Sequence, residues 1–295
     1  MSGVMCVWAT LPEEALDWYE NEYLPERTNA HSKSTIYCEA TESGLDSEPI
    51  GHLGTPWELM SVYEVEDIKQ MSKESYDKKT HPPKEMMNGI LKGSRFDVKT
   101  CREIARWGGD HWDGDVNRIT SVTAMEWRIP KEEEEEVITF YTKDLAPMVA
   151  ESEDVLRFRL FEVENATFLE GENYVTKEKD SLHTYFTLVE FETDEWPWDK
   201  IMQLSENPKW RRYFESQEIV KWQTSHYMVN RAYLPEQSSK PDEEDSKAST
   251  AFSRDESAMS FPRIAPGVGS PMVFFNFPPA VCVLMLCIIC QEDTE

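Results

Sequence analysis

Apolar side chains recur at helical spacing in two separate segments of the chain. In each segment the apolar positions are three and then four residues apart, which places them on one face of an amphipathic helix. Pro12 and Pro130 suit the first turns of these helices, and Pro25 and Pro147 are expected to end them. The apolar positions are Leu16, Tyr19 and Tyr23 in the first segment, and Ile138, Tyr141 and Leu145 in the second.

Runs of branched and aromatic residues predict β-strands before and after each of these helices. A second helix is expected in each half, at 68–91 and at 198–216. The pattern therefore predicts the order βαββαβ twice. The expected strands are Gly3–Thr10, Thr35–Ala40, Glu58–Glu66 and Lys99–Trp107, and then Ile119–Ile129, Phe158–Val163, Tyr185–Thr193 and Lys221–Ala232.

A short internal repeat accompanies this order of elements. The segment Trp18–Pro25 matches Phe140–Pro147, with an aromatic pair, an acid and a proline in register. On the preceding strands, Trp8 is expected to correspond to Trp127. Self-similarity at a fixed spacing indicates a structural unit that occurs twice.

Each predicted unit should form one antiparallel sheet with both helices on one face, which leaves the other face uncovered. We therefore predict an α+β fold of two ferredoxin-like βαββαβ repeats, whose uncovered sheet faces pack together as an intramolecular α+β barrel around a dry centre. The predicted boundaries are 1–107 for the first repeat, 108–117 for a linker, 118–234 for the second repeat, 235–271 for a disordered linker and 272–295 for an apolar tail.

The chain is strongly acidic, with 56 Asp and Glu against 30 Lys and Arg in 295 residues and a formal net charge of −26. Because Lys and Arg must neutralise phosphates in nucleic-acid binding, this charge argues against nucleic acids and anionic membrane surfaces as partners. Met1–Ala9 has the pattern of a strand and not of a secretory signal, which predicts a cytoplasmic protein with reduced thiols. The six cysteines show no zinc spacing and the glycines no phosphate loop, so no metal and no cofactor is predicted.

The C-terminal region differs in composition from the rest of the chain. Residues 236–270 are rich in Ser, Asp, Glu, Lys and Pro without periodicity, which predicts a disordered linker. The apolar run from Ala280 to Cys290 is shorter than the roughly 20 residues that a membrane span requires. A tail anchor, with Cys287 or Cys290 palmitoylated, is the alternative to a protein without membrane contact.

Three stretches carry a resemblance to a known family: Gly3–Trp8, Asp17–Pro25 and Leu59–Glu64. They resemble the EthD-like members of the dimeric α+β barrel group, and the second half looks like a more diverged copy, so that the resemblance covers about residues 1–234. It implies a small-molecule protein of catabolic or polyketide-tailoring pathways. The family usually has a histidine directly after the acid of the helix motif, where this chain has Tyr23 and Leu145.

Glu22, Tyr23 and Asp144 are the candidate acid–base residues, because they lie at helix ends that approach the sheet rim in such folds. A carboxylate at this place acts as a general base if burial raises its pKa, and a tyrosine hydroxyl can orient a substrate oxygen. The alternative is structural: Tyr23 packs in the core, and the acids cap the helix or form local ion pairs.

His52 and His183 are candidate ligand-binding residues at the mouth of the barrel, since each precedes the third strand of its half. The alternative is a pair of surface loop histidines, because no serine, cysteine or carboxylate completes a triad. The cluster Asp110–Asp115 lacks the EF-hand pattern and is interpreted as a connector between the halves.

Aromatic residues on the predicted strands are candidates for the wall of an interior pocket, because aromatic walls suit flat apolar ligands. The alternative is that they are ordinary core residues. These residues are Trp8, Tyr37, Trp127, Phe158 and Phe161.

Two functions of different classes follow from these observations. The first is a small-molecule enzyme of secondary metabolism that acts on a hydrophobic aromatic or polyketide-like substrate. Glu22 and Tyr23 would carry out lyase-type acid–base tailoring (dehydration, decarboxylation or cyclisation) without a cofactor. The second is a noncatalytic barrel that binds a hydrophobic ligand or is related to stress, which the missing family histidine favours. The enzyme is the main hypothesis and the noncatalytic barrel the alternative, and the sequence leaves self-association open.

Overall fold

The computed structural model describes residues 2–40, 57–76, 82, 84–108, 111–170, 173–177 and 185–236. We call residues 2–108 the first half of the chain and residues 111–236 the second half. The predicted tail, with its apolar run, and most of the predicted linker before it lie outside the described residues. Among the helices described, none is long and apolar enough to cross a membrane.

Nine strands form one sheet in the order β4-β1-β3-β2-β9-β5-β8-β6-β7, and β4 also pairs with β6. This last pairing closes eight of the strands into a barrel, and β7 extends the sheet beyond β6. All pairs are antiparallel. The strands are β1 Gly3–Thr10, β2 Ser34–Ala40, β3 Leu59–Val65, β4 Arg95–Gly108, β5 Ser121–Arg128, β6 Val155–Glu170, β7 Asn173–Lys177, β8 Tyr185–Phe191 and β9 Lys221–Tyr233.

The predicted fold class, two ferredoxin-like βαββαβ repeats that pack through their uncovered sheet faces, is wrong. The halves join edge to edge, through β2 with β9 and β4 with β6, in one continuous closed sheet. The physical reason lies in the strand edges, whose backbone N–H and C=O groups need partners that face-to-face packing does not supply. Strands β4, β6 and β9 are also longer than the sequence pattern predicted, with 14, 16 and 13 residues, so each can pair along both of its edges.

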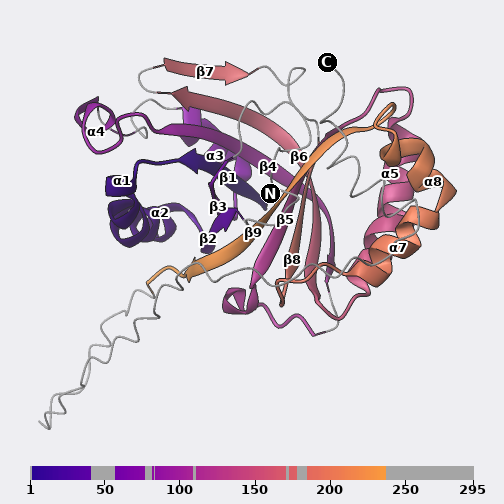
Figure 1. Cartoon of the computed structure of the whole chain (residues 1–295). Helices are drawn as coiled ribbons and strands as arrows, with labels where there is room; N and C mark the ends of the chain where they lie inside the picture. Colours follow the sequence, from indigo (N-terminus) through magenta and orange to yellow (C-terminus); the bar gives the residue numbers. More distant parts are fainter. Residues whose placement is uncertain are drawn as a thin grey trace, which may run out of the picture.

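Short helices cover the outside of the barrel, α1 and α2 on one side and α5, α7 and α8 on the other (Figure 1). The described α-helices are α1 Glu13–Trp18, α2 Leu24–His31, α3 Ile68–Tyr76, α4 Lys84–Asn88, α5 Glu134–Phe140, α6 Ala146–Ala150, α7 Trp198–Glu206 and α8 Pro208–Trp210. The π-helical turns are η1 Tyr19–Tyr23, η4 Tyr141–Leu145 and η6 Arg211–Glu215, and η3 Val116–Arg118 is a 3₁₀ turn.

Pro25 and Pro147 do not end their helices, contrary to the prediction. Each stands in the first turn of a further α-helix, α2 or α6, that follows directly on a π-helical turn. Because proline has no N–H, it breaks an α-helical ladder, but the wider π turn shifts the hydrogen-bond register before the proline. The helix therefore continues past it, and the first residue of each π turn, Tyr19 or Tyr141, is buried against the sheet.

The barrel interior is filled by apolar residues and by a network of buried charges. Lys99 forms ion pairs with Glu126 and, at 3.1 Å, with Asp97, and its ammonium lies 4.5 Å from the centre of the Trp8 ring. Arg159 donates to Glu190 at 2.6 Å deeper in the same interior. Buried charges of opposite sign compensate one another here, so the interior of the described barrel is a packed core.

Alternation along the strands places Trp8 and Trp127 on opposite faces of the sheet. Trp8 packs in the barrel interior with Phe186, at 5.7 Å between ring centroids. Trp127 is fully buried on the outer face, stacked on Tyr141 at 4.6 Å and on Tyr185 at 4.7 Å. The expected correspondence of the two tryptophans is therefore wrong, because a shift of one residue along a strand moves a side chain to the other face.

Candidate ligand site

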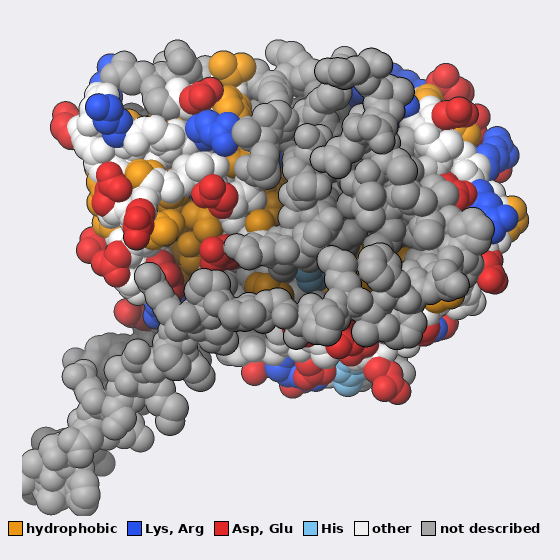
Figure 2. All heavy atoms as spheres, in the orientation of Figure 1, with side chains coloured by type: hydrophobic (Ala, Val, Ile, Leu, Met, Phe, Trp, Pro, Cys, Tyr) orange, Lys and Arg blue, Asp and Glu red, His pale blue; other side chains and the backbone are white. Residues whose placement is uncertain are grey.

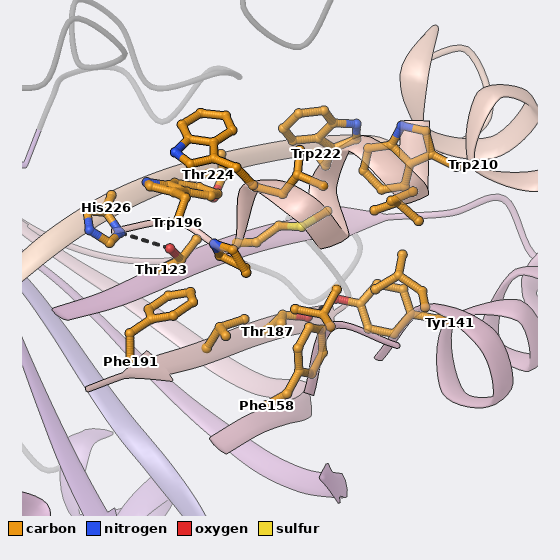
Figure 3. Close-up of a pocket in the computed structure, with 18 of the residues that line it drawn as sticks. Thr123, Tyr141, Phe158, Thr187, Phe191, Trp196, Trp210, Trp222, Thr224 and His226 are labelled. Carbon is orange, nitrogen blue, oxygen red and sulfur yellow. Dashed lines mark hydrogen bonds between the residues drawn. The ribbon is translucent and has the colours of Figure 1, made fainter. Parts of the chain in front are cut away.

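A cavity of about 160 Å³ lies between the outer face of the barrel in the second half and the helices that cover it. Strands β5, β6, β8 and β9 form its floor, and η4, α6, α7 and α8 form its roof and sides. Figure 3 shows Trp196, Trp210 and Trp222 on one side of the cavity and Phe158, Thr187 and Phe191 on the other. The lining residues are Thr123, Met125, Tyr141, Leu145, Val149, Phe158, Thr187, Val189, Phe191, Trp196, Pro197, Trp198, Ile201, Leu204, Trp210, Trp222, Thr224, Ser225 and His226.

Local structure turns the floor residues outward. Val122, Ala124 and Glu126 of β5 face the barrel interior, so that Thr123 and Met125 face the helices. The same alternation on β8 sends Thr187, Val189 and Phe191 outward, whereas Phe186, Leu188 and Glu190 face inward.

Four tryptophans supply most of the ring surface around the cavity. Asn207 caps α8 by accepting from the backbone N–H groups of Lys209 and Trp210, at 2.8 and 3.4 Å. This cap fixes Trp210, which stacks on Phe214 at 5.0 Å between centroids. Trp222 donates from Nε1 to the Phe214 carbonyl at 2.8 Å. Trp196 and Trp198 complete the wall, and Trp198 is 40% exposed, which places it at the mouth.

A tyrosine and two threonines provide polar groups in this apolar setting. The Tyr141 hydroxyl and Thr187 Oγ1 lie 2.6 Å apart, and Thr187 Oγ1 also accepts from Trp127 Nε1 at 3.1 Å. Since Trp127 occupies one lone pair of Thr187, this network fixes the rotamers of all three side chains. Burial raises the pKa of Tyr141 well above its ordinary value, so its hydroxyl stays protonated.

His226 lies at the opposite end of the cavity from Tyr141 (Figure 3). Its Nδ1 is 3.0 Å from Thr123 Oγ1, and its ring lies 5.3 Å from Trp196 and 6.0 Å from Phe191 between centroids. Burial lowers the pKa of His226 from 6.5 to about 4, against a smaller opposing effect of Asp194. The imidazole is therefore neutral at physiological pH.

A smaller cavity of about 70 Å³ lies at the matching place in the first half. Tyr19, Tyr23 and Tyr63 line it together with Arg27, and Tyr23 stacks on Tyr19 at 5.4 Å with 20° between the ring planes. The Tyr19 hydroxyl is 3.2 Å from Ser61 Oγ, as Tyr141 contacts Thr187 in the larger cavity. Among the described residues no cluster of three or more His, Cys, Asp or Glu side chains could hold a metal ion.

The structure separates the predicted acid–base residues from the larger cavity. Tyr23 lines the smaller cavity and is partly buried, whereas Glu22 beside it is exposed. Asp144 is also exposed and forms an ion pair with Lys209 at 3.2 Å. Their catalytic role stays a prediction. The prediction required burial to raise the pKa of the Glu22 carboxylate, and the structure leaves Glu22 exposed.

The predicted aromatic wall is distributed over three places. Phe158 lines the larger cavity, and Trp127 packs behind Tyr141. Tyr37 is buried on the outer face of the first half, 6.1 Å from Tyr19 between centroids. Trp8, like Phe161, faces the barrel interior. His52 and His183 lie outside the described residues.

Sequence reasoning missed His226 and the tryptophans at 196, 210 and 222. The strand pattern contained one signal, because Trp222, Thr224 and His226 alternate along a predicted strand and therefore share a face. Nothing in the pattern distinguished this face from the barrel interior.

Comparisons with known protein families and with curated proteins find no match to this chain. Among solved structures, the fold is similar to that of an anthrone oxidase-like protein, with a TM-score of 0.51, 10% sequence identity, and coverage of 80% of this chain and 94% of that one. Two proposed monooxygenases, from Lactobacillus acidophilus NCFM and from Fusobacterium nucleatum, each have a TM-score of 0.46 and each cover 79% of this chain. Their sequence identities are 8% and 9%, and the matches cover 96% and 94% of those chains, respectively.

The first of these likenesses supports a fold related to that of α+β barrel proteins, here an eight-stranded antiparallel barrel with helices on its outside. At 10% identity it shows the fold alone. Membership of the EthD-like group in particular, and the tandem duplication that the sequence suggested, stay predictions.

Proposed function

We propose that this protein binds a small, flat, largely apolar aromatic molecule with one oxygen substituent in the larger cavity. The observation that carries the proposal is the lining itself: four tryptophans, Phe158 and Phe191 surround a buried space that has a hydrogen-bonded histidine at one end. Aromatic walls with a few placed polar groups are typical of sites for flat ligands.

The volume limits the size of the ligand. Dry apolar cavities of about 150 Å³ bind a single benzene ring, and this cavity has about 160 Å³ and opens beside Trp198. A ligand of one or two rings therefore fits. The similar structure is named as an anthrone oxidase-like protein, and anthrone is a ketone with three fused rings, which is larger than the ligand proposed here.

The oxygen of the ligand is assigned to the end of the cavity that holds His226 and Thr123. These side chains are neutral and can exchange hydrogen bonds with a phenol or a carbonyl. The apolar rings of the ligand would then lie against Phe158, Val189 and Trp222.

Acid–base tailoring without a cofactor is the second candidate function. Its support in the cavity is His226, because a neutral imidazole can polarise a carbonyl by donating a hydrogen bond. In contrast, general acid–base catalysis works best when the pKa of the catalytic group lies near the operating pH. The pKa of His226 is about 4 and that of Tyr141 is raised, which favours binding over proton transfer.

Titration with 1-naphthol, followed by tryptophan fluorescence, tests the proposal. We expect saturable quenching in the wild type, because the ligand would contact several of the four tryptophans. The variant Val149→Phe fills the cavity and should abolish saturation. Val98→Phe makes the same change in the smaller cavity and should leave binding unchanged.

Two results would contradict the proposal. One is the absence of saturable binding of 1-naphthol to the folded wild type. The other is equal binding by Val149→Phe and the wild type, with both folded by circular dichroism, which would place the ligand elsewhere.

A further inference from the structure

Among the residues that the structure describes, the lining of the larger cavity contains no lysine, arginine, aspartate or glutamate. The polar groups of its side chains are hydroxyls, the indole N–H groups of the tryptophans and the imidazole of His226, and none of them is a cation at physiological pH. We infer that the cavity accepts uncharged aromatic ligands and excludes their anions, so that it binds a phenol and rejects the corresponding phenolate or carboxylate. This inference rests on the proposed function and names the class of ligand that the site selects.

Desolvation is the first physical reason for this selectivity. An ion that leaves water for an apolar site loses far more hydration free energy than a neutral hydroxyl does. A buried anion is retained only where a cation or several hydrogen-bond donors compensate it. In this cavity the hydrogen bond between Tyr141 and Thr187 at 2.6 Å uses one of their two O–H donors, and Thr224 donates to the Ala124 carbonyl at 3.3 Å.

The charges around the cavity act in the same direction. Asp194 lies near His226, and the exposed Glu195 precedes the ring-bearing residues Trp196 and Trp198 at the mouth. The whole chain carries a formal net charge of −26. Acidic side chains are spread over the described parts of the face in Figure 2. Such a field lowers the local concentration of anions and leaves neutral molecules unaffected.

Three cations of α7, α8 and the following π turn have partners outside the cavity. Lys200 of α7 forms an ion pair with Glu151 at 3.5 Å, and Lys209 of α8 pairs with Asp144 at 3.2 Å. Arg211 donates from Nε to the Ser205 carbonyl at 2.9 Å. None of these three residues belongs to the cavity lining among the described residues.

The smaller cavity provides an internal contrast, because a cation does line it. Arg27 of α2 lines the smaller cavity. Helix α2 follows the π turn η1 in the first half, and helix α6 follows the π turn η4 in the second half. Val149 of α6 lines the larger cavity. The second half therefore has an apolar residue where the first half has a guanidinium.

The test compares three ligands of one ring system on the wild-type chain: naphthalene, 1-naphthol and 1-naphthoate. We expect naphthalene and 1-naphthol to bind, and 1-naphthoate to bind at least about tenfold more weakly, a difference of about 1.4 kcal/mol. Equal binding of all three would overturn the inference and leave the proposed function intact. Binding of none would overturn the proposed function and this inference with it.

A second pair of ligands separates charge from shape. The affinity of 4-nitrophenol should fall about tenfold for each pH unit above the pKa of its hydroxyl, whereas that of 4-nitroanisole, which cannot ionise, should stay constant. Parallel pH profiles for the two ligands would contradict the inference.

A reversal variant tests the same point from the side of the protein. Val149→Arg introduces a cation into the lining, and Val149→Gln is the matched uncharged control. If the absence of charge sets the selectivity, the ratio of 1-naphthoate to 1-naphthol affinity should rise at least about tenfold in Val149→Arg relative to Val149→Gln. An unchanged ratio in the folded variants would count against the inference. Should Val149→Arg fail to fold, the ligand series on the wild type decides alone.

Discussion

The two outer cavities lie at matching places on one barrel, yet one has more than twice the volume of the other, about 160 against 70 Å³. In each, a buried tyrosine at the start of a π-helical turn, Tyr19 or Tyr141, contacts a hydroxyl in the middle of a strand. The frame is therefore similar, and the difference in volume comes from the side chains around it.

Two positions show how the smaller cavity is filled. Tyr23 at the end of its π turn stacks on Tyr19, whereas Leu145 ends the corresponding turn of the second half. On the floor, the cross-strand pair Met5 and Tyr63 faces the first cavity, and the pair Thr123 and Val189 faces the second. Since a cavity is the space that side chains leave, a phenol ring at each of these two positions reduces the space in the first half.

The largest effect is expected from Lys99→Met, which tests whether one barrel supports both cavities. Removal of the ammonium leaves Asp97 and Glu126 buried without compensation, so the free energy of unfolding should fall by about 3–5 kcal/mol. Urea denaturation measures this change. Arg102→Met removes partly exposed ion pairs with Glu162 and Glu164 and should cost about 0–1 kcal/mol. Two separate unfolding transitions would mean that the halves are independent, and the comparison would then fail.

A pH effect should belong to the larger cavity alone, because His226 lines it and no histidine is among the residues of the smaller one. The folded-state pKa of about 4 lies below the ordinary 6.5, so the unfolded chain binds more protons between these values. Stability from this group is complete above pH 6.5 and is lost as the pH falls toward 4.

The slope from this single group reaches at most about 1.4 kcal/mol per pH unit. Thermal denaturation of the wild type and of His226→Gln between pH 4 and 6.5 measures this slope. The carboxylates titrate in both proteins, so the difference between the two profiles belongs to His226. Identical pH profiles would show that His226 is not buried as a neutral imidazole.

Exchange of the residues that end the two π turns should move the ligand site. Leu145→Tyr places a phenol ring in the larger cavity and should weaken 1-naphthol binding by more than about tenfold, or 1.4 kcal/mol. Tyr23→Leu should open the smaller cavity and leave the affinity of the larger one unchanged. Fluorescence titration measures both. If Leu145→Tyr binds like the wild type, the volume difference does not control binding.

The smallest effects are expected for the buried hydroxyls. Tyr141→Phe removes the hydrogen bond to Thr187, and Tyr19→Phe removes the one to Ser61, each worth about 0.5–1.5 kcal/mol. We expect the larger loss for Tyr141, because its hydroxyl is 2.6 Å from Thr187, whereas Tyr19 is 3.2 Å from Ser61. Chemical denaturation of both variants gives the order, and the reverse order would contradict this view of the two networks.

Local patterning determined most of the secondary structure. The strand and helix periods around Tyr19 and Tyr141 predicted the elements that form there, since side-chain alternation and helical spacing are properties of the sequence itself. The same pattern placed Trp222, Thr224 and His226 on one face of a strand. It could not say that the face is covered by α7 and α8.

The closure of the sheet and the site were decided only by the tertiary structure. Whether β2 pairs with β9 and β4 with β6 depends on strand edges that are far apart in sequence, and hydrophobic periodicity carries no information about edges. The register then set the face of each residue, which sent Trp8 inward and Trp127 outward. The sequence by itself therefore determined which segments are strands and helices, whereas long-range pairing and packing decided where a cavity remains.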